Sequence, residues 1–150
     1  MKKALLIGGV ALAALVVAGV VFGPQLHDHL FGPVTPLGRV REVKPVAAWG
    51  DPNDPNRVLP EPGKQFWLVL IDARSGASGP AEGETAKELV DKASVIDDVG
   101  NRHKLWNAKY HAQWTGKQMT VTTFELFFSL PKERQPRSFQ VGDAPAVELP

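Results

Sequence analysis

The chain has 150 residues, which is enough for one folded domain and an additional segment. Of its 17 lysines and arginines and 16 aspartates and glutamates, Lys2, Lys3 and Asp28 fall within the first 33 residues, which leaves 15 of each sign for the remainder. This balance excludes a strong electrostatic attraction to nucleic acid or anionic lipid. The absence of cysteine excludes disulfides and a lipid-modified thiol.

The N-terminal segment is apolar. Residues 4–23 carry no polar side chain and follow Lys2 and Lys3. A helix of this length spans about 30 Å, the thickness of a hydrocarbon core. We therefore expect residues 1–23 to be a single-pass transmembrane signal anchor in the cell membrane, with a cytoplasmic N-terminus and an extracytoplasmic domain.

A cleaved signal peptide is the alternative, because it shares the basic start and the apolar run, and it would make the protein secreted. The run is longer than a typical signal core and lacks a good cleavage site, which favours retention. Gly19 and Gly23 form a GxxxG pattern that could bring two such helices together. Residues 24–36 are expected to be a spacer.

Residues 37–150 are predicted to form short strands. The first begins near Gly38, and a loop with four prolines follows over residues 49–63. The apolar run at residues 65–73 indicates a strand that is buried on both faces or central in a sheet. Residues 84–92 resemble a short helix with a capping box, although a strand at residues 93–96 could extend backward into them.

The second half of the chain continues this pattern. The sequence DDVGN at residues 97–101 predicts a turn in which Gly100 and Asn101 can take positive φ. We expect separate strands at residues 103–106 and 110–114, and a last strand at residues 146–149.

The longest strand is expected at residues 119–130. Its alternation breaks between Thr123 and Phe124, which predicts a bulge or bend. Pro131 should end this strand, a charged turn follows, and residues 138–141 return as the second strand of a hairpin. Seven to eight short strands at this spacing predict a mainly β domain, an antiparallel sandwich over residues 37–150.

Two segments carry a family resemblance. Residues 93–104 are similar to the "x-L-x-D-x-x-G-x-x-Y" hairpin of a family of bacterial exported immunoglobulin-like domains of unknown function (the DUF4352 type). Residues 123–142 resemble its closing segment, with five positions in step: Phe128, Pro131, Lys132, Pro136 and Phe139. The resemblance covers about a third of the chain, and it implies an immunoglobulin-like β-sandwich without catalytic residues to carry over. Glu133, His103 and the helix-like insert at Glu84 depart from the pattern.

The four tryptophans divide into two expected classes. Trp67 and Trp106 lie within predicted strands and are expected in the core. Trp49 lies in the proline loop and Trp114 precedes a turn, so both are candidates for exposed contacts with a partner protein or a sugar.

Polar residues offer little reaction chemistry. The chain has no cysteine and no GxSxG motif, and we expect no enzyme activity and no cofactor. His103 and His111 could meet across adjacent strands near Asp97 or Asp98, but we expect them to be sheet-surface residues rather than metal ligands.

The sequence therefore predicts a membrane-tethered, extracytoplasmic β-sandwich that acts as a binding or interaction module of the bacterial cell envelope, with another envelope protein as its partner. The alternative is a metal-dependent or enzymatic envelope protein that uses His103, His111 and Asp97 or Asp98. A third possibility is a scaffold that positions its anchor in an assembly through Gly19 and Gly23.

Overall fold

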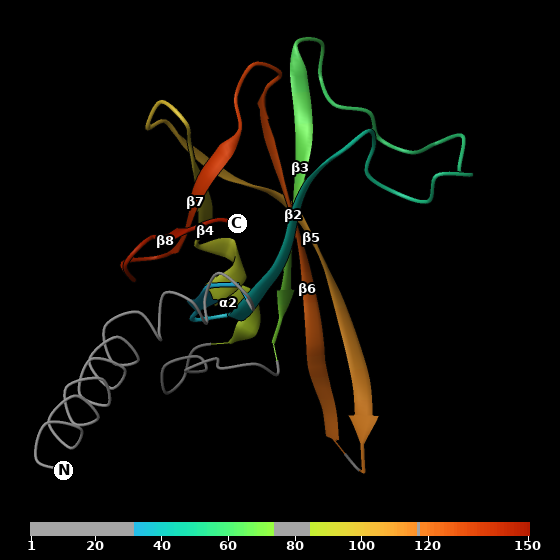
Figure 1. Ribbon diagram of the computed structural model, residues 1–150. Helices are drawn as coiled ribbons and strands as arrows, with labels where there is room; N and C mark the ends of the chain where they lie inside the picture. The colour runs from blue at the N-terminus through green and yellow to red at the C-terminus, as the bar shows by residue number, and fades with distance from the viewer. Residues whose placement is uncertain (1–31, 74–84, 117) are drawn as a thin grey trace, which may run out of the picture. The chain divides into compact units, whose positions relative to one another are not determined.

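Eight antiparallel strands form one sheet in the computed structural model, which describes residues 32–73, 85–116 and 118–150 (Figure 1). The strand order is β1-β2-β3-β6-β5-β4-β7-β8, and the sheet is nearly closed. The elements are β1 (Val34–Thr35), β2 (Gly38–Val46), β3 (Lys64–Asp72), α2 (Ala86–Asp91), β4 (Ala93–Asp97), β5 (Arg102–Thr115), β6 (Gln118–Pro131), β7 (Pro136–Val141) and β8 (Val147–Glu148).

The mainly β, antiparallel prediction is confirmed, whereas a sandwich of two separate sheets is not shown. Within the described residues, no helix has the length and apolar character needed to cross a membrane. The predicted anchor at residues 1–23, with Gly19 and Gly23, lies outside the described residues, as does the spacer up to residue 31. The compact unit begins at Gly32, five residues before the boundary expected at Leu37, and it includes β1, which is already part of the sheet.

The sheet is built around β6, which pairs with β3 on one side and with β5 on the other. Both edges of β6 are therefore occupied, and β7 pairs with β4 and β8 instead. The predicted hairpin between residues 119–130 and 138–141 is wrong for this reason. The charged turn after Pro131 carries the chain to a different part of the sheet.

A bulge interrupts β6 at the place where its alternation breaks. His111 pairs with Thr123 and Ala112 pairs with Val121, so Thr122 is the additional residue. The Thr122 hydroxyl donates a hydrogen bond to the carbonyl oxygen of His111 over 3.2 Å. The predicted bulge is confirmed, one residue earlier than expected, and after it the even-numbered residues of β6 face the core.

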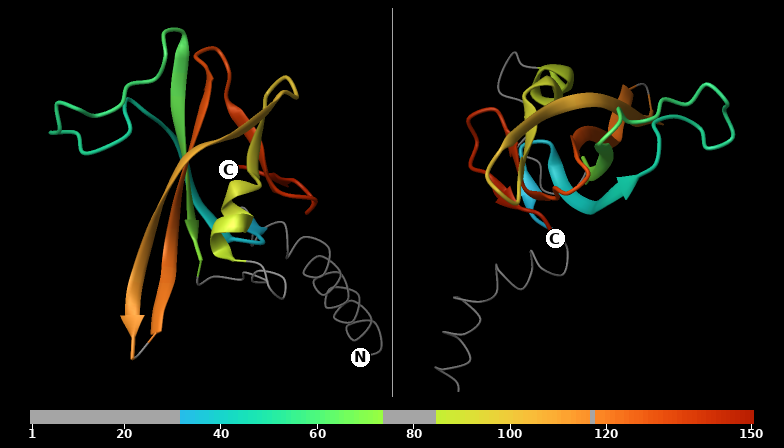
Figure 2. Two further views of the ribbon diagram at one scale, coloured as in Figure 1. Left: turned by 180° about the vertical axis from the view of Figure 1, so that it is seen from behind. Right: turned by 90° about the horizontal axis from the view of Figure 1, so that it is seen from above.

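β5 is one continuous strand, so the prediction of separate strands at residues 103–106 and 110–114 is wrong. Its first residues, 102–104, pair with β4, and the remainder pairs with β6. The two sets of pairs meet beside a second bulge, in which Trp106 is the additional residue between the pairs Leu105–Phe128 and Asn107–Phe127. In the view from above, β5 arches from the β4 part of the sheet to the β6 part (Figure 2).

The core lies between these two parts of the sheet. Phe128 of β6 and Phe139 of β7 are fully buried and meet edge to face, with ring centroids 6.2 Å apart. Apolar side chains from β2, β3, β4, β6 and β7, from the β1–β2 turn and from α2 complete this cluster: Leu37, Val40, Val69, Ile71, Leu89, Val90, Ala93, Val95, Phe124, Leu126, Leu130 and Val141. β3 carries buried side chains on both of its own faces, which confirms the prediction made from its unbroken apolar run.

The short helix α2 is confirmed together with its cap. Thr85 accepts a hydrogen bond from the Glu88 N–H over 3.2 Å, and the Glu88 carboxylate accepts one from the Thr85 N–H over 2.6 Å. Leu89 and Val90 point into the core. β4 begins at Ala93, so it does not extend backward into the helix.

Replacing Thr85 by alanine should lower the free energy of unfolding by about 1 kcal/mol, because the Glu88 N–H loses its acceptor. Serine at this position keeps the hydroxyl and should leave the stability nearly unchanged. Guanidinium unfolding of the full-length chain in mild detergent, followed by tryptophan fluorescence, compares the two variants. Equal losses in both would contradict a role for the hydroxyl.

Candidate binding site

The face of the sheet opposite the core carries a second apolar cluster. Phe66 and Leu68 of β3 and Phe127 of β6 are buried, yet they point away from the core side chains with which they alternate. Leu68 and Phe127 are directly opposite each other in register. We call the side of the sheet on which these three side chains lie the outer face.

The proline loop begins beside the outer face, where Trp49 contacts Trp106, and then projects away from the strands (Figure 1). It extends from the ends of β2 and β3 (Figure 1), and Trp49 and Val58 pair their backbones across it through hydrogen bonds of 2.8 and 2.9 Å. Between them, the side chains of Asp51 and Asp54 each accept a hydrogen bond from the backbone N–H two residues later, over 2.8 Å. The predicted loop is confirmed as irregular, apart from this one bridge.

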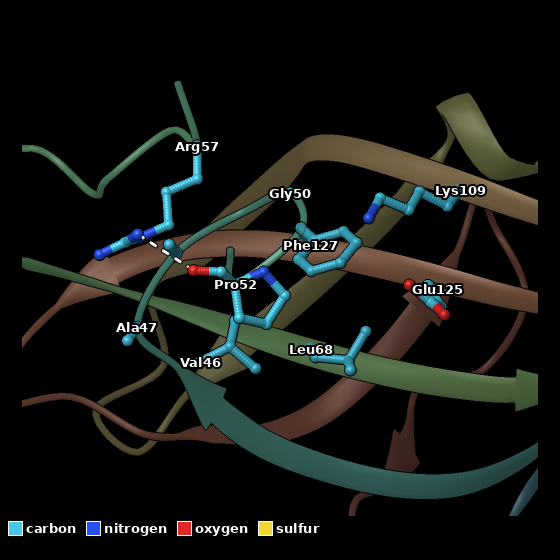
Figure 3. Close-up of a pocket in the computed structure, with 10 residues that line it drawn as sticks. Val46, Ala47, Gly50, Pro52, Arg57, Leu68, Lys109, Glu125 and Phe127 are labelled. Carbon is cyan, nitrogen blue, oxygen red and sulfur yellow. Dashed lines mark hydrogen bonds between the residues drawn. The ribbon is translucent and has the colours of Figure 1, made fainter. Parts of the chain in front are cut away.

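A pocket of about 470 Å³ opens between the loop and the outer face (Figure 3). This volume lies in the range that small-molecule sites occupy. The lining is mainly apolar and comes from four separate segments of the chain: Val46, Ala47, Ala48, Gly50, Pro52, Arg57, Leu68, Lys109, Glu125 and Phe127.

Three charged side chains line this apolar pocket. The Lys109 ammonium lies 5.4 Å from the ring centroid of Trp49 and 5.8 Å from that of Phe127. Glu125 is opposite Lys109 in register, but its carboxylate binds His111 Nε2 over 2.7 Å. Among the described residues Lys109 has no ion pair, and its ammonium lies over the two aromatic rings.

Arg57 is the second cation of the pocket. Its guanidinium donates a hydrogen bond to the carbonyl oxygen of Pro52 over 3.1 Å, which holds the side chain against the loop (Figure 3). Within the part of the chain that the structure describes, no carboxylate pairs with Arg57. The pocket therefore combines an apolar floor with two cations that make no ion pair with a described carboxylate.

Trp106 belongs to the outer face, and the prediction that it is a core residue is wrong. As the additional residue of the β5 bulge it is 40% exposed, and its ring lies 4.5 Å from Phe66 and 5.8 Å from Trp49, centroid to centroid. Trp49 is half-buried by this contact instead of being fully exposed. The two rings extend the aromatic surface beside Lys109.

The other tryptophans match their predicted environments. Trp67 packs against the core, and Trp114 is 73% exposed near the end of the β5–β6 hairpin. The indole N–H groups of Trp49 and Trp67 are buried without a hydrogen-bond partner in the described structure. Trp49 and Trp114 lie in different parts of the molecule, so the two sequence candidates do not form one site.

The structure does not bring His103 and His111 together. Both lie on β5, eight residues apart, which corresponds to about 26 Å along an extended strand. Each binds a different carboxylate: His103 contacts Asp97 over 2.9 Å and His111 contacts Glu125 over 2.7 Å. The described residues contain no group of three side chains placed to hold a metal ion.

Asp97 instead organises the turn between β4 and β5. Its buried side chain accepts hydrogen bonds from the backbone N–H groups of Asn101, over 2.8 Å, and Val99, over 3.1 Å. Gly100 takes a φ of 90°, whereas Asn101 does not take positive φ. Burial raises the pKa of Asp97, but the hydrogen bonds from His103, Asn101 and Val99 outweigh it and lower the pKa from 3.8 to about 2.

This pKa predicts a loss of stability in acid. Because the pKa is lower in the folded chain than the unfolded value of 3.8, the stabilisation by ionised Asp97 is complete above that value and disappears as the pH falls toward 2. An Asp97→Asn variant keeps one oxygen acceptor but cannot ionise, so its stability should change less between pH 4 and pH 2. Guanidinium unfolding at several pH values measures both slopes, and parallel slopes would contradict the assignment.

The comparisons with known proteins add no relative. The chain matches no protein-family model, and no similar curated protein or solved structure was found.

Proposed function

We propose that the chain is a membrane-tethered, extracytoplasmic binding module of the bacterial cell envelope, and that the pocket on the outer face is its binding site. The observation that carries this proposal is the open apolar pocket of about 470 Å³ with two cations, Lys109 and Arg57, that make no ion pair with a described residue. An apolar surface with convergent polar groups is the usual form of a recognition site.

The proposed tether is the apolar segment at residues 4–23, which follows Lys2 and Lys3. It supplies enough length for one membrane crossing and the charge asymmetry that leaves the N-terminus in the cytoplasm. The partner under this proposal is another envelope protein, and the module works without a cofactor or catalysis.

The immunoglobulin-like sandwich and the family resemblance are part of the same proposal. They are supported by the two parts of the sheet that meet along β5, with Phe128 and Phe139 packed between them. Asp97 and Gly100, which occupy two positions of the resembling hairpin, hold its turn. The enzymatic alternative gains no such support, because His103 and His111 engage separate carboxylates.

The tether and the binding site can be tested in one strain. A photo-crosslinking residue in place of Ala47, in the pocket, should capture a partner, whereas the same residue at exposed position 104 of β5, outside the pocket, should not. Alkaline carbonate should leave the full chain in the membrane pellet, and a Leu15→Glu change should release it. Equal crosslinking at both positions would refute the site, and release of the unchanged chain would refute the tether.

A further inference from the structure

The charges of the pocket define its occupant more closely, and the choice of occupant rests on the proposed binding function. The only described acidic lining residue, Glu125, is already bound to His111. The two cationic lining residues, Lys109 and Arg57, have no carboxylate partner in the described structure. A ligand with negative charge beside an apolar group would satisfy both the cations and the floor of Leu68 and Phe127.

The position of Lys109 makes this requirement specific. Its ammonium is drawn over the faces of Trp49 and Phe127, so the charge is held at the pocket and does not extend freely into solvent. A carboxylate that binds there meets a cation whose side chain is already ordered, which lowers the entropy cost of the contact.

The surroundings of the pocket favour an extended peptide as the occupant. Val46 and Ala47 line the pocket at the point where β2 ends (Figure 3). β1 pairs with β2 only up to Arg39, so from Arg41 to Val46 the outer edge of β2 has no strand beside it within the described residues. A peptide lying along this edge would deliver a side chain into the pocket, whereas an acyl chain gains nothing from it.

Pro45 shapes how such a peptide would be held. Proline has no N–H, so this edge lacks one backbone donor and a full strand ladder cannot form along it. The side chain in the pocket and the charge on Lys109 would therefore decide which peptides bind. We propose that the pocket recognises an extended segment of a partner protein in which an acidic residue adjoins an aromatic or aliphatic one.

Synthetic peptides and ¹⁵N-indole-labelled full-length chain in detergent micelles test this. The probe is acetyl-Gly-Asp-Phe-Asp-Gly-amide, and the matched probe has asparagine in place of both aspartates. We expect the acidic peptide to move the indole signals of Trp49 and Trp106 in a saturable way and to leave those of Trp67 and Trp114 in place. The asparagine peptide should bind at least about 5-fold more weakly, and the difference should shrink at high salt.

Charge variants of the protein complete the test. In Lys109→Gln the affinities of the two peptides should differ by less than about 2-fold, because the cation that pairs with the aspartates is gone. Lys104→Gln is the matched control, since Lys104 is an exposed lysine of the same strand outside the pocket, and it should keep the full difference.

Three outcomes would overturn the proposal: equal binding of the two peptides, an unchanged preference in Lys109→Gln, or no movement of the Trp49 signal at millimolar peptide. Decanoate moving the same signals while the peptides do not would identify an acyl carboxylate as the occupant and refute a peptide. If a partner still crosslinks at position 47 when the acidic preference is absent, the proposed function stands and only this inference fails.

Discussion

Replacing Phe128 by alanine should lower the free energy of unfolding by about 3 to 5 kcal/mol. Phe128 is fully buried three residues before the end of β6, between Trp67 of β3 and Leu105 of β5 in register, and it contacts the ring of Phe139. Alanine would leave a cavity where the two parts of the sheet meet, and strands paired on both sides cannot move inward to fill it. Guanidinium unfolding of the full-length chain in mild detergent measures the loss.

The matched control is Trp114→Ala. Trp114 is also a large aromatic residue of the central β5–β6 pair, but it is 73% exposed, so its removal should change the stability by less than about 0.5 kcal/mol. A loss below about 1 kcal/mol for Phe128→Ala would contradict the burial of this ring between the two parts of the sheet. A comparable loss in both variants would mean that Trp114 is buried in solution.

Local patterns predicted local structure well. The unbroken apolar run of β3, the capping box of α2 and the Gly100 turn each depend on residues close together in the chain, and each is present. The bulge in β6 was also predictable, because a shift in which residues face inward requires an additional residue. These features need no knowledge of which strands are neighbours.

Strand partners were not predictable in the same way. The expected β6–β7 hairpin followed from sequence proximity, but β3 pairs with one edge of β6 along its whole length and β5 pairs with the other from Leu105 onward. A period of two does not describe β5 as one strand, because its inward residues near the bulge, Leu105 and Ala108, are three positions apart. The same bulge turns Trp106 outward, so the tryptophan was assigned to the wrong face.

The pocket was not predictable because four segments form it. The sequence indicated Trp49 as a contact residue, and the structure places it beside the pocket, where the ammonium of Lys109 lies over its ring. Arg57, Lys109 and Phe127 carried no signal of their own, since a charged loop residue and a strand lysine are ordinary features. Only the register that sets Lys109 opposite Glu125, and Leu68 opposite Phe127, makes them one site.

Gly38→Ala is expected to be as damaging as the loss of Phe128, although it adds only one methyl group. Gly38 begins β2 with a φ of +132°, and an added Cβ would lie 2.2 Å from the carbonyl oxygen of Asp72 and 2.9 Å from Ala73 Cα, the backbone where β3 ends. Positive φ alone costs a residue with a side chain about 1 to 3 kcal/mol. Because backbone atoms cannot rotate away as a side chain can, the total loss should be about 3 kcal/mol or more.

Gly63→Ala separates the clash from the conformational cost. Gly63 has a φ of +80°, but no atom lies within 4 Å of its added Cβ, so only the left-handed backbone is penalised and the loss should be about 1 to 2 kcal/mol. Guanidinium unfolding of both variants measures the difference. Equal losses would mean that no backbone atom crowds Gly38 in solution. The close pairing of the start of β2 with the end of β3 would then not hold, and the course of β2 from there to the pocket would be in question as well.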